Sequence, residues 1–161
     1  MMRLYTPPYG KDHYTFGFMN GPMDATINWL SDCLNISSYP RMAALPPQLW
    51  ELEALGHLSL AQLPRLAVFP DMSLLGNVKT LVLENMAGLA ALSAPMASAP
   101  ALACLQVKTC RNMRTVETAF VDALSEQACF LFLHLGDCPV ALNPAMARLR
   151  HLEGLHIHTS L

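Results

Sequence analysis

The chain has 161 residues, of which 53% are hydrophobic and only 14% are charged. This balance excludes a largely disordered chain and suits a single domain with a sizeable core. Ten basic and twelve acidic residues give a formal net charge of −2, so the overall charge gives no indication of a nucleic-acid or anionic-membrane ligand.

Residues 1–30 show no clear repeat and are predicted to form an N-terminal cap or an irregular arm. The opening segment, MMRLYTPPYGKDHYTFGF, lacks the uninterrupted apolar core of about 7–15 residues that a secretory signal peptide requires. We therefore expect a cytoplasmic protein. Its odd number of cysteines, five, leaves at least one thiol free, and we expect buried apolar thiols and not a zinc knuckle.

From Asp32 onwards, one spacing of leucines recurs along the chain. It is clearest in LEALGHLSLAQLPRL, where the leucines from Leu55 to Leu63 read L-x-x-L-x-L-x-x-L and mix three-residue steps with a two-residue step. Neither a helix nor a simple strand has that periodicity. Successive copies of the central L-x-L pair begin 22–28 residues apart, at Leu34/Ile36, Leu58/Leu60, Leu81/Leu83, Leu105/Val107, Leu133/Leu135 and Leu155/Ile157.

Each L-x-L pair is predicted to lie on a short strand. Alternate side chains of a strand point to the same side, so both leucines would enter a core while the residue between them faces outwards. One such unit cannot bury its leucines alone, whereas stacking the units in parallel covers each layer with the next. Full burial of one leucine contributes about 1.5–3 kcal/mol, so several layers offset the cost of ordering the chain. The predicted core is formed by the ten residues from Leu58/Leu60 to Leu155/Ile157.

The segments between these strands carry apolar residues near helical spacing, as at Leu49, Leu52 and Leu55. We expect them to return the chain along the side opposite the strands. The segment from Arg114 to Phe130 is the longest and most helix-like. Its apolar residues recur at three- and four-residue steps, at Val116, Phe120, Val121 and Leu124.

An uncharged stretch from Asn85 to Val107 is long enough to cross a bilayer of about 30 Å. However, Pro95 and Pro100 would break a helix there, and the repeat runs through the stretch. We therefore expect no membrane partner.

With its flanking residues the repeat reads L-x-x-L-x-L-x-x-C-x-x-L, followed by a proline. LACLQVKTCRNM and FLFLHLGDCPVA supply the cysteine, and the prolines are Pro70, Pro95 and Pro144. From Asp32 to Leu161 this pattern resembles the leucine-rich-repeat superfamily, and it is most similar to the repeats of intracellular plant-type immune receptors and of related effector or scaffold proteins. The resemblance implies an α/β fold, a curved leucine-rich-repeat solenoid with a parallel β-sheet on its concave face and helical or irregular segments on its convex face.

Residues 31–161 would then form about six repeats, the C-terminal one incomplete. Solenoids normally cap their ends, and no capping element follows the last repeat in this sequence. Two explanations stay open: the chain is a fragment of a longer protein, or it forms a homo-oligomer through the uncapped C-terminal end.

The chain departs from the family pattern at the ninth position of the repeat, which is commonly Asn or Cys. Leu63 and Met86 offer no hydrogen-bond donor there, so we expect irregular stacking of their repeats. Cys110 and Cys138 are expected to be buried structural thiols. The full set of ninth-position residues is Tyr39, Leu63, Met86, Cys110, Cys138 and Ser160.

The resemblance implies non-catalytic protein–protein recognition through the concave face, which the outward strand residues would form. This face changes towards the C-terminal end, where an aromatic residue, histidines and an aspartate gather on neighbouring strands about 5 Å apart. The candidate partner-binding residues are His57, Gln62, Glu84, Gln106, Lys108, Phe132, His134, Asp137, His156 and His158.

Two expectations concern charged groups on this face. Glu84 and Lys108 hold equivalent positions on adjacent strands and are predicted to form a surface ion pair worth at most about 1 kcal/mol. The histidines leave three interpretations open: zinc ligation, a pH-sensitive partner contact, and a solvated face without a role. We predict neither a metal nor a cofactor.

Catalytic signatures such as G-x-S-x-G, G-x-x-x-x-G-K-[ST], H-E-x-x-H and G-x-G-x-x-G are absent from the sequence. We therefore predict a protein that is not an enzyme and that binds a protein partner, as a recognition module of, or related to, an intracellular receptor. The alternative is the substrate-binding domain of a pathogen effector or adaptor whose enzymatic part lies outside this chain. A third hypothesis is an enzyme that uses the histidine cluster.

Overall fold

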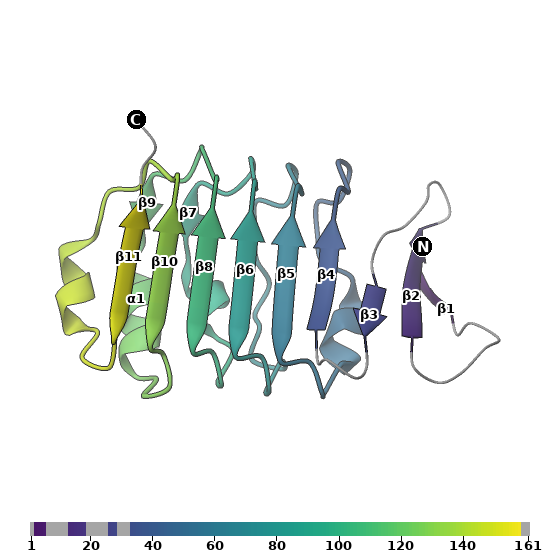
Figure 1. Cartoon of the computed structure of the whole chain (residues 1–161), viewed down its shortest axis with the longest axis horizontal. Helices are drawn as coiled ribbons and strands as arrows, with labels where there is room; N and C mark the ends of the chain where they lie inside the picture. The colour runs from purple at the N-terminus through teal and green to yellow at the C-terminus, as the bar shows by residue number, and fades with distance from the viewer. Residues whose placement is uncertain (1, 6–12, 19–25, 29–32, 159–161) are drawn as a thin grey trace.

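The computed structural model describes residues 2–5, 13–18, 26–28 and 33–158. They form a nine-stranded sheet in the order β1-β2-β3-β4-β5-β6-β8-β10-β11 and a separate pair of short strands (Figure 1). The fold is α/β with a six-stranded parallel part, as the sequence predicted. The parallel strands are β4 Cys33–Ser37, β5 His57–Ala61, β6 Thr80–Glu84, β8 Cys104–Lys108, β10 Phe132–Gly136 and β11 Gly154–His158.

Three antiparallel strands precede the parallel part: β1 Met2–Tyr5, β2 His13–Phe18 and β3 Thr26–Asn28. β3 pairs antiparallel with β4, so the described parts of residues 1–30 extend the same sheet.

The parallel strands pair in a constant register. Leu34 is level with Leu58, and the same step leads to Leu81, Leu105, Leu133 and Leu155 on the following strands. The second residue of each L-x-L pair forms a matching column from Ile36 to Ile157. Eight of the ten predicted core residues are fully or almost fully buried, which confirms the stacked leucine layers: Leu58, Leu60, Leu81, Leu83, Leu105, Val107, Leu133 and Leu135.

The core prediction is wrong for the last pair. Leu155 and Ile157 are aligned with their columns, but their side chains are 45% and 40% exposed. β11 is the outermost strand of the described sheet, so these side chains are covered from the β10 side only. An apolar side chain is buried only when neighbouring strands cover it on both sides. The spacing of leucines within one repeat gives no information on those neighbouring strands.

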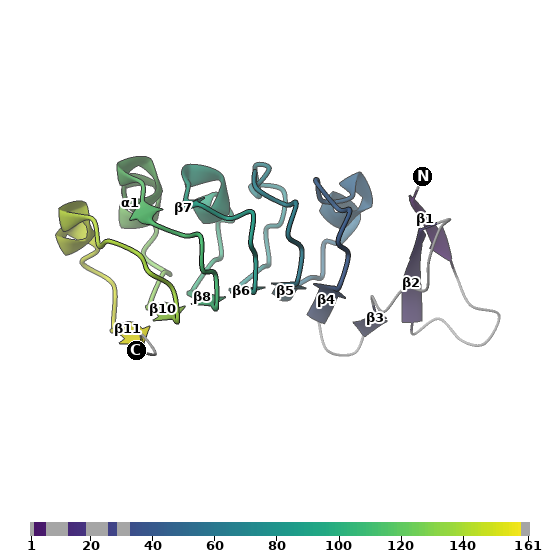
Figure 2. The same ribbon diagram turned by 90° about the horizontal axis from the view of Figure 1, so that it is seen from above.

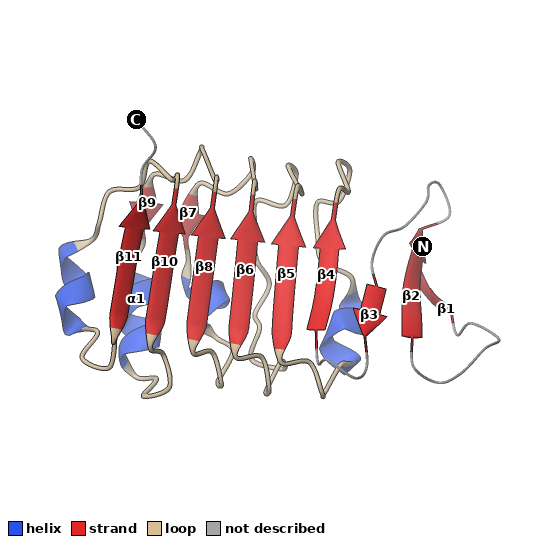
Figure 3. Ribbon diagram, in the orientation of Figure 1, coloured by secondary structure: helices blue, strands red, loops and turns tan. Residues whose placement is uncertain are grey.

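Helices lie on one side of the parallel sheet and leave the other side uncovered (Figures 2 and 3). Three are short 3₁₀ helices, η1 Pro47–Glu51, η2 Ala94–Ala97 and η3 Pro144–Arg148, and each has a proline in its first turn, where a missing backbone N–H costs little. The chain between β5 and β6 returns without a helix, although Pro70 lies there. Within the described ranges, no helix is long and apolar enough to cross a membrane.

The α-helix α1 Thr118–Ser125 lies in the segment predicted to be most helical. Its apolar residues Phe120, Val121 and Leu124 are buried in the hydrophobic core, as their spacing predicted. Val116 is also buried, but it belongs to the short strand β9 Thr115–Val116, which pairs with β7 Ala91–Leu92. The helix therefore begins after Val116 and not before it.

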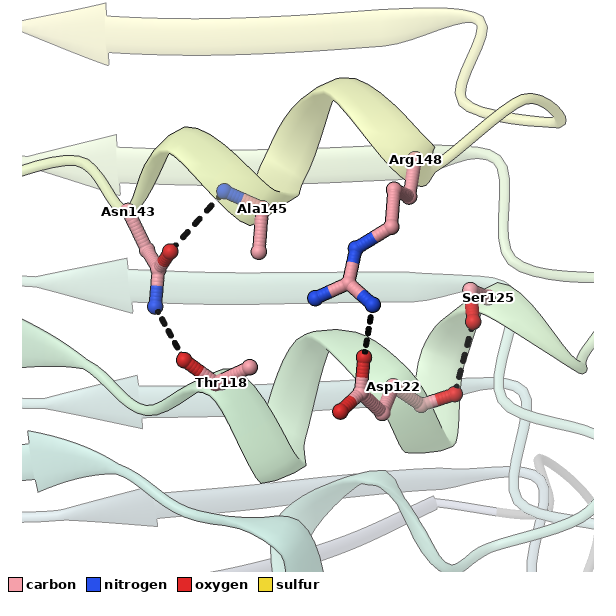
Figure 4. A network of polar contacts seen from close by, with 6 residues as sticks. All are labelled: Thr118, Asp122, Ser125, Asn143, Ala145 and Arg148. Atoms are coloured by element: carbon pink, nitrogen blue, oxygen red, sulfur yellow. Dashed lines mark hydrogen bonds and ion pairs between the residues drawn. The ribbon is translucent and has the colours of Figure 1, made fainter.

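Polar contacts join α1 to η3 on the outer side of the core (Figure 4). The guanidinium of Arg148 lies 2.8 Å from the carboxylate of Asp122. Asn143 donates from Nδ2 to the hydroxyl of Thr118 (3.0 Å), and its Oδ1 accepts from the backbone N–H of Ala145 (2.9 Å). Asn143 thus caps η3 and ties it to the preceding helix.

The ninth position of the repeat is buried at Leu63, Met86, Cys110 and Cys138. The thiols lie near neighbouring carbonyls, Cys110 Sγ at 3.4 Å from the oxygen of Lys108 and Cys138 Sγ at 3.2 Å from that of Gly136. The Cys110 thiol donates a hydrogen bond to Cys138, which lowers the pKa of Cys138 and, together with burial, raises the pKa of Cys110. Both thiols are buried, as the sequence predicted, and their structural role stays a prediction.

Two related expectations fail. The stacking at Leu63 and Met86 is regular, because β5, β6 and β8 keep the same five-residue register. In addition, the thiols of Cys33, Cys104 and Cys129 are only half-buried. Tyr39 is half-buried against the core, and Ser160 lies outside the described residues.

Candidate functional site: the open face of the sheet

We call the side of the parallel sheet that faces away from the helices the open face (Figure 2). The first, third and fifth residues of each strand point to the open face, since the second and fourth form the L-x-L pair that points to the core. The register aligns these residues in three columns across the six strands. The first column is Cys33, His57, Thr80, Cys104, Phe132 and Gly154; the middle is Asn35, Ser59, Val82, Gln106, His134 and His156; the last is Ser37, Ala61, Glu84, Lys108, Gly136 and His158.

At the carboxyl end of five strands, the next residue adopts a left-handed backbone. These residues are not glycines, and their φ values lie between 51° and 63°, at Ser38, Gln62, Asn85, Thr109 and Asp137. Each donates its backbone N–H to a carbonyl on the next strand; the Gln62 N–H, for example, lies 3.0 Å from the oxygen of Glu84. This bond continues the hydrogen-bond ladder one residue past the strand. It also satisfies the backbone carbonyl of the last residue of the next strand, such as Ala61 and Glu84.

Two predicted contact residues, Gln62 and Asp137, belong to this row of turns and not to the strands. The side chain of Gln62 is already engaged, because its Oε1 accepts a hydrogen bond of 2.8 Å from the Ser38 hydroxyl. Gln62 and Asp137 therefore form the rim of the open face, next to the last column at the carboxyl ends of the strands. The other eight candidate residues lie in the three columns.

The open face differs in chemistry from one end to the other. On β4 and β5 it carries small residues such as Asn35, Ser59 and Ala61, with His57 in the first column. On β10 and β11 it carries Phe132 and three histidines. His57 is separated from this cluster by β6 and β8, so the structure does not bring it together with the other histidines.

His134 and His156 face each other across β10 and β11. Their ring centroids are 4.7 Å apart and their planes are tilted by 48°. Partial burial, followed by the positive charge of His156, Lys108 and His158, lowers the pKa of His134. The cluster thus disfavours a second positive charge at this point of the face.

Two glycines create the space that these rings occupy. A Cβ atom added at Gly136 would lie 3.0 Å from Nε2 of His134, and one added at Gly154 would lie 2.6 Å from Cδ1 of Phe132. The Phe132 ring therefore lies over the backbone of β11, with 46% of its surface exposed. A larger residue at Gly154 would displace the ring.

The predicted ion pair between Glu84 and Lys108 is not formed. The two residues are level on β6 and β8, but the described residues contain a single ion pair, Arg148 with Asp122. An exposed pair gains too little to hold two long side chains in one geometry. The positive charge of Lys108 contributes to the lowered pKa of His134 on the next strand.

The histidine cluster has two rings in contact. In the part of the chain that the structure describes, no three or more His, Cys, Asp or Glu side chains are placed so that they could hold a metal ion. Two half-buried residues of the first column, Cys33 and Cys104, were not predicted to point outwards.

The alternation of the strand could have identified Cys104. It lies two residues before the outward Gln106, and it is level with Thr80 and Phe132 on the neighbouring strands.

Comparison of the chain with protein-family models, with curated proteins and with solved structures finds no match.

Proposed function

We propose that this chain is a leucine-rich-repeat solenoid that recognises a protein partner through the open face, as a recognition module of, or related to, an intracellular receptor. The observation that carries the proposal is the uncovered side of six parallel, in-register strands with Phe132 exposed at one end. Exposed aromatic side chains on a rigid surface commonly dominate protein contacts.

The dimensions of the open face favour one segment of a partner over a broad flat domain. Five residues per strand and six strands give roughly 16 Å by 24 Å, or about 400 Å². A standard protein interface buries about 800 Å² on each side. A loop, strand or short helix laid across the columns therefore matches the surface, with the turn residues Gln62 and Asp137 as its rim.

A pair of matched substitutions tests this proposal. Val82 lies in the middle column near the centre of the open face, whereas Val68 lies between β5 and β6 with 77% of its surface exposed. We expect Val82→Arg to weaken binding of a partner captured by the intact chain at least about tenfold, which corresponds to about 1.4 kcal/mol. Val68→Arg should leave the affinity unchanged.

Binding is measured by titration calorimetry, and far-UV circular dichroism checks that both variants remain folded. The proposal fails when the captured partner binds Val82→Arg with the affinity of the unaltered chain, or when Val68→Arg alone abolishes binding.

A further inference from the structure

The three strands at one end of the open face carry basic side chains and no acidic ones. Lys108 lies on β8, His134 on β10, and His156 and His158 on β11, and none of these strands contains Asp or Glu. The remaining outward positions of the three strands hold uncharged residues: Cys104, Gln106, Phe132, Gly136 and Gly154.

Among the described residues, three acidic groups lie beside this cluster. Glu84 on β6 is level with Lys108, Asp137 follows β10 in the row of turns, and Glu153 directly precedes β11. The groups that face His134 itself are His156 and His158 from β11 and Lys108 from β8, and all three act to keep it neutral. A negatively charged group placed above the ring pair would reverse this effect, because an opposite charge nearby favours the protonated imidazole.

Phe132 supplies an apolar contact beside the basic groups. Its ring lies over Gly154 and is half exposed, and Phe132 precedes His134 by two residues on β10. The end of the open face thus offers a cationic cluster and an aromatic surface within reach of two adjacent side chains of a bound peptide.

We propose that this end of the open face binds an acidic peptide segment, whose carboxylate lies over His134, His156 and Lys108 and whose neighbouring apolar side chain packs on Phe132. The inference depends on the proposed function, since it names the class of partner that the open face takes. Charge complementarity selects the partner, and the size of the face limits it to one segment.

Binding of this kind is linked to protons. In the free chain the pKa of His134 is lowered by burial and by its cationic neighbours. A bound carboxylate raises that pKa, so the complex holds more protons than the free chain at the same pH. Affinity therefore increases as pH falls through the range between the two pKa values, near the ordinary titration of histidine at about 6.5.

The test uses a phage-displayed library of random peptides selected on the intact chain at about pH 6, on the acid side of the ordinary titration of histidine at about 6.5. We expect the recovered sequences to be enriched in Asp or Glu beside an aromatic or aliphatic residue. A labelled copy of the most enriched peptide should bind at least about tenfold more weakly at about pH 8 than at about pH 6 in fluorescence anisotropy. The same peptide with its acid replaced by the amide should lose this pH dependence.

Variants locate the site. The double variant His134→Asn, His156→Asn should lose the pH dependence, whereas His151→Asn, at an exposed histidine between η3 and β11 outside the open face, should retain it. Basic or uncharged consensus sequences, no enrichment above a selection without protein, or an equal effect of His151→Asn would each overturn the inference. A peptide that is weakened by Val82→Arg but insensitive to pH and to the double variant would overturn this inference and leave the proposed function intact. A peptide unaffected by Val82→Arg and by the double variant would overturn both.

Discussion

The interior of the parallel sheet and its outer end contain the same L-x-L motif but use it differently. On β5, β6 and β8 both residues of each pair are fully buried between neighbouring strands. On β11 the corresponding Leu155 and Ile157 are nearly half exposed. The interior is therefore held by stacked apolar layers, whereas the outer end also depends on the polar contacts between η3 and α1. Identical sequence motifs thus make unequal contributions to stability.

The largest expected effect separates these two regions directly. Leu81→Ala should lower the free energy of unfolding by about 2–5 kcal/mol, because it opens a cavity between β5 and β8. Leu155→Ala should cost about 1 kcal/mol or less, since much of the side chain already contacts solvent. Urea unfolding followed by circular dichroism measures both values. Equal losses would contradict the comparison.

Close approach of neighbouring repeats gives the next effect. A Cβ atom at Gly88 would lie 2.7 Å from the backbone oxygen of Pro64, so Gly88→Ala should destabilise the fold by about 1–3 kcal/mol. At Gly154 the obstacle is the Phe132 ring, which can turn aside, and the loss should be smaller. Gly76 has no atom within 4 Å of the added methyl, and it serves as the control. Thermal melts of the three variants should follow this order.

A smaller loss is expected at the capping residue of the outer end. Asn143→Ala removes the cap of η3 and the bonds that Nδ2 donates to the Thr118 hydroxyl and the Val116 carbonyl, at a cost of about 0.5–2 kcal/mol. Asn143→Asp keeps an oxygen acceptor for the Ala145 N–H but loses both bonds donated by Nδ2, so it separates the cap from the other two contacts. Denaturant midpoints compare the variants. No loss in either would show that the outer end does not depend on this residue.

The smallest effect concerns the ion pair of Arg148 with Asp122. Both side chains are about half exposed, so Arg148→Ala should reduce stability by about 0.2–1 kcal/mol. The loss should shrink at high salt, where exposed charges are screened. In a double-mutant cycle with Asp122→Asn, the second substitution should add little. Additive losses at low salt would mean that the two groups stabilise the fold separately.

The leucine columns could be predicted because they depend on spacing alone. An L-x-L pair recurring every 22–28 residues specifies one strand per repeat and a shared register, which the pairing from Leu34 to Leu155 confirms. The helix containing Phe120, Val121 and Leu124 was predictable for the same reason. Both patterns are local properties of the chain.

The failures have a common cause in contacts between repeats. Exposure of Leu155 depends on what lies beyond β11, and Glu84 and Lys108 form no ion pair although they are level on β6 and β8. The place of the Phe132 ring depends on a glycine 22 positions later. A single repeat contains no information on these neighbours. The predicted site residues therefore mostly lie in the columns of the open face, whereas the contacts between them were not predicted from the sequence.

The left-handed residue after each strand has a consequence for how this surface can vary. One backbone conformation recurs there in Ser38, Gln62, Asn85, Thr109 and Asp137, so it is fixed by the main-chain bond to the next strand and not by side-chain identity. A turn fixed by main-chain bonds tolerates substitution of the outward residues on either side of it. Evolution or protein engineering can therefore change the side chains of the open face one column at a time while the backbone of the sheet stays the same.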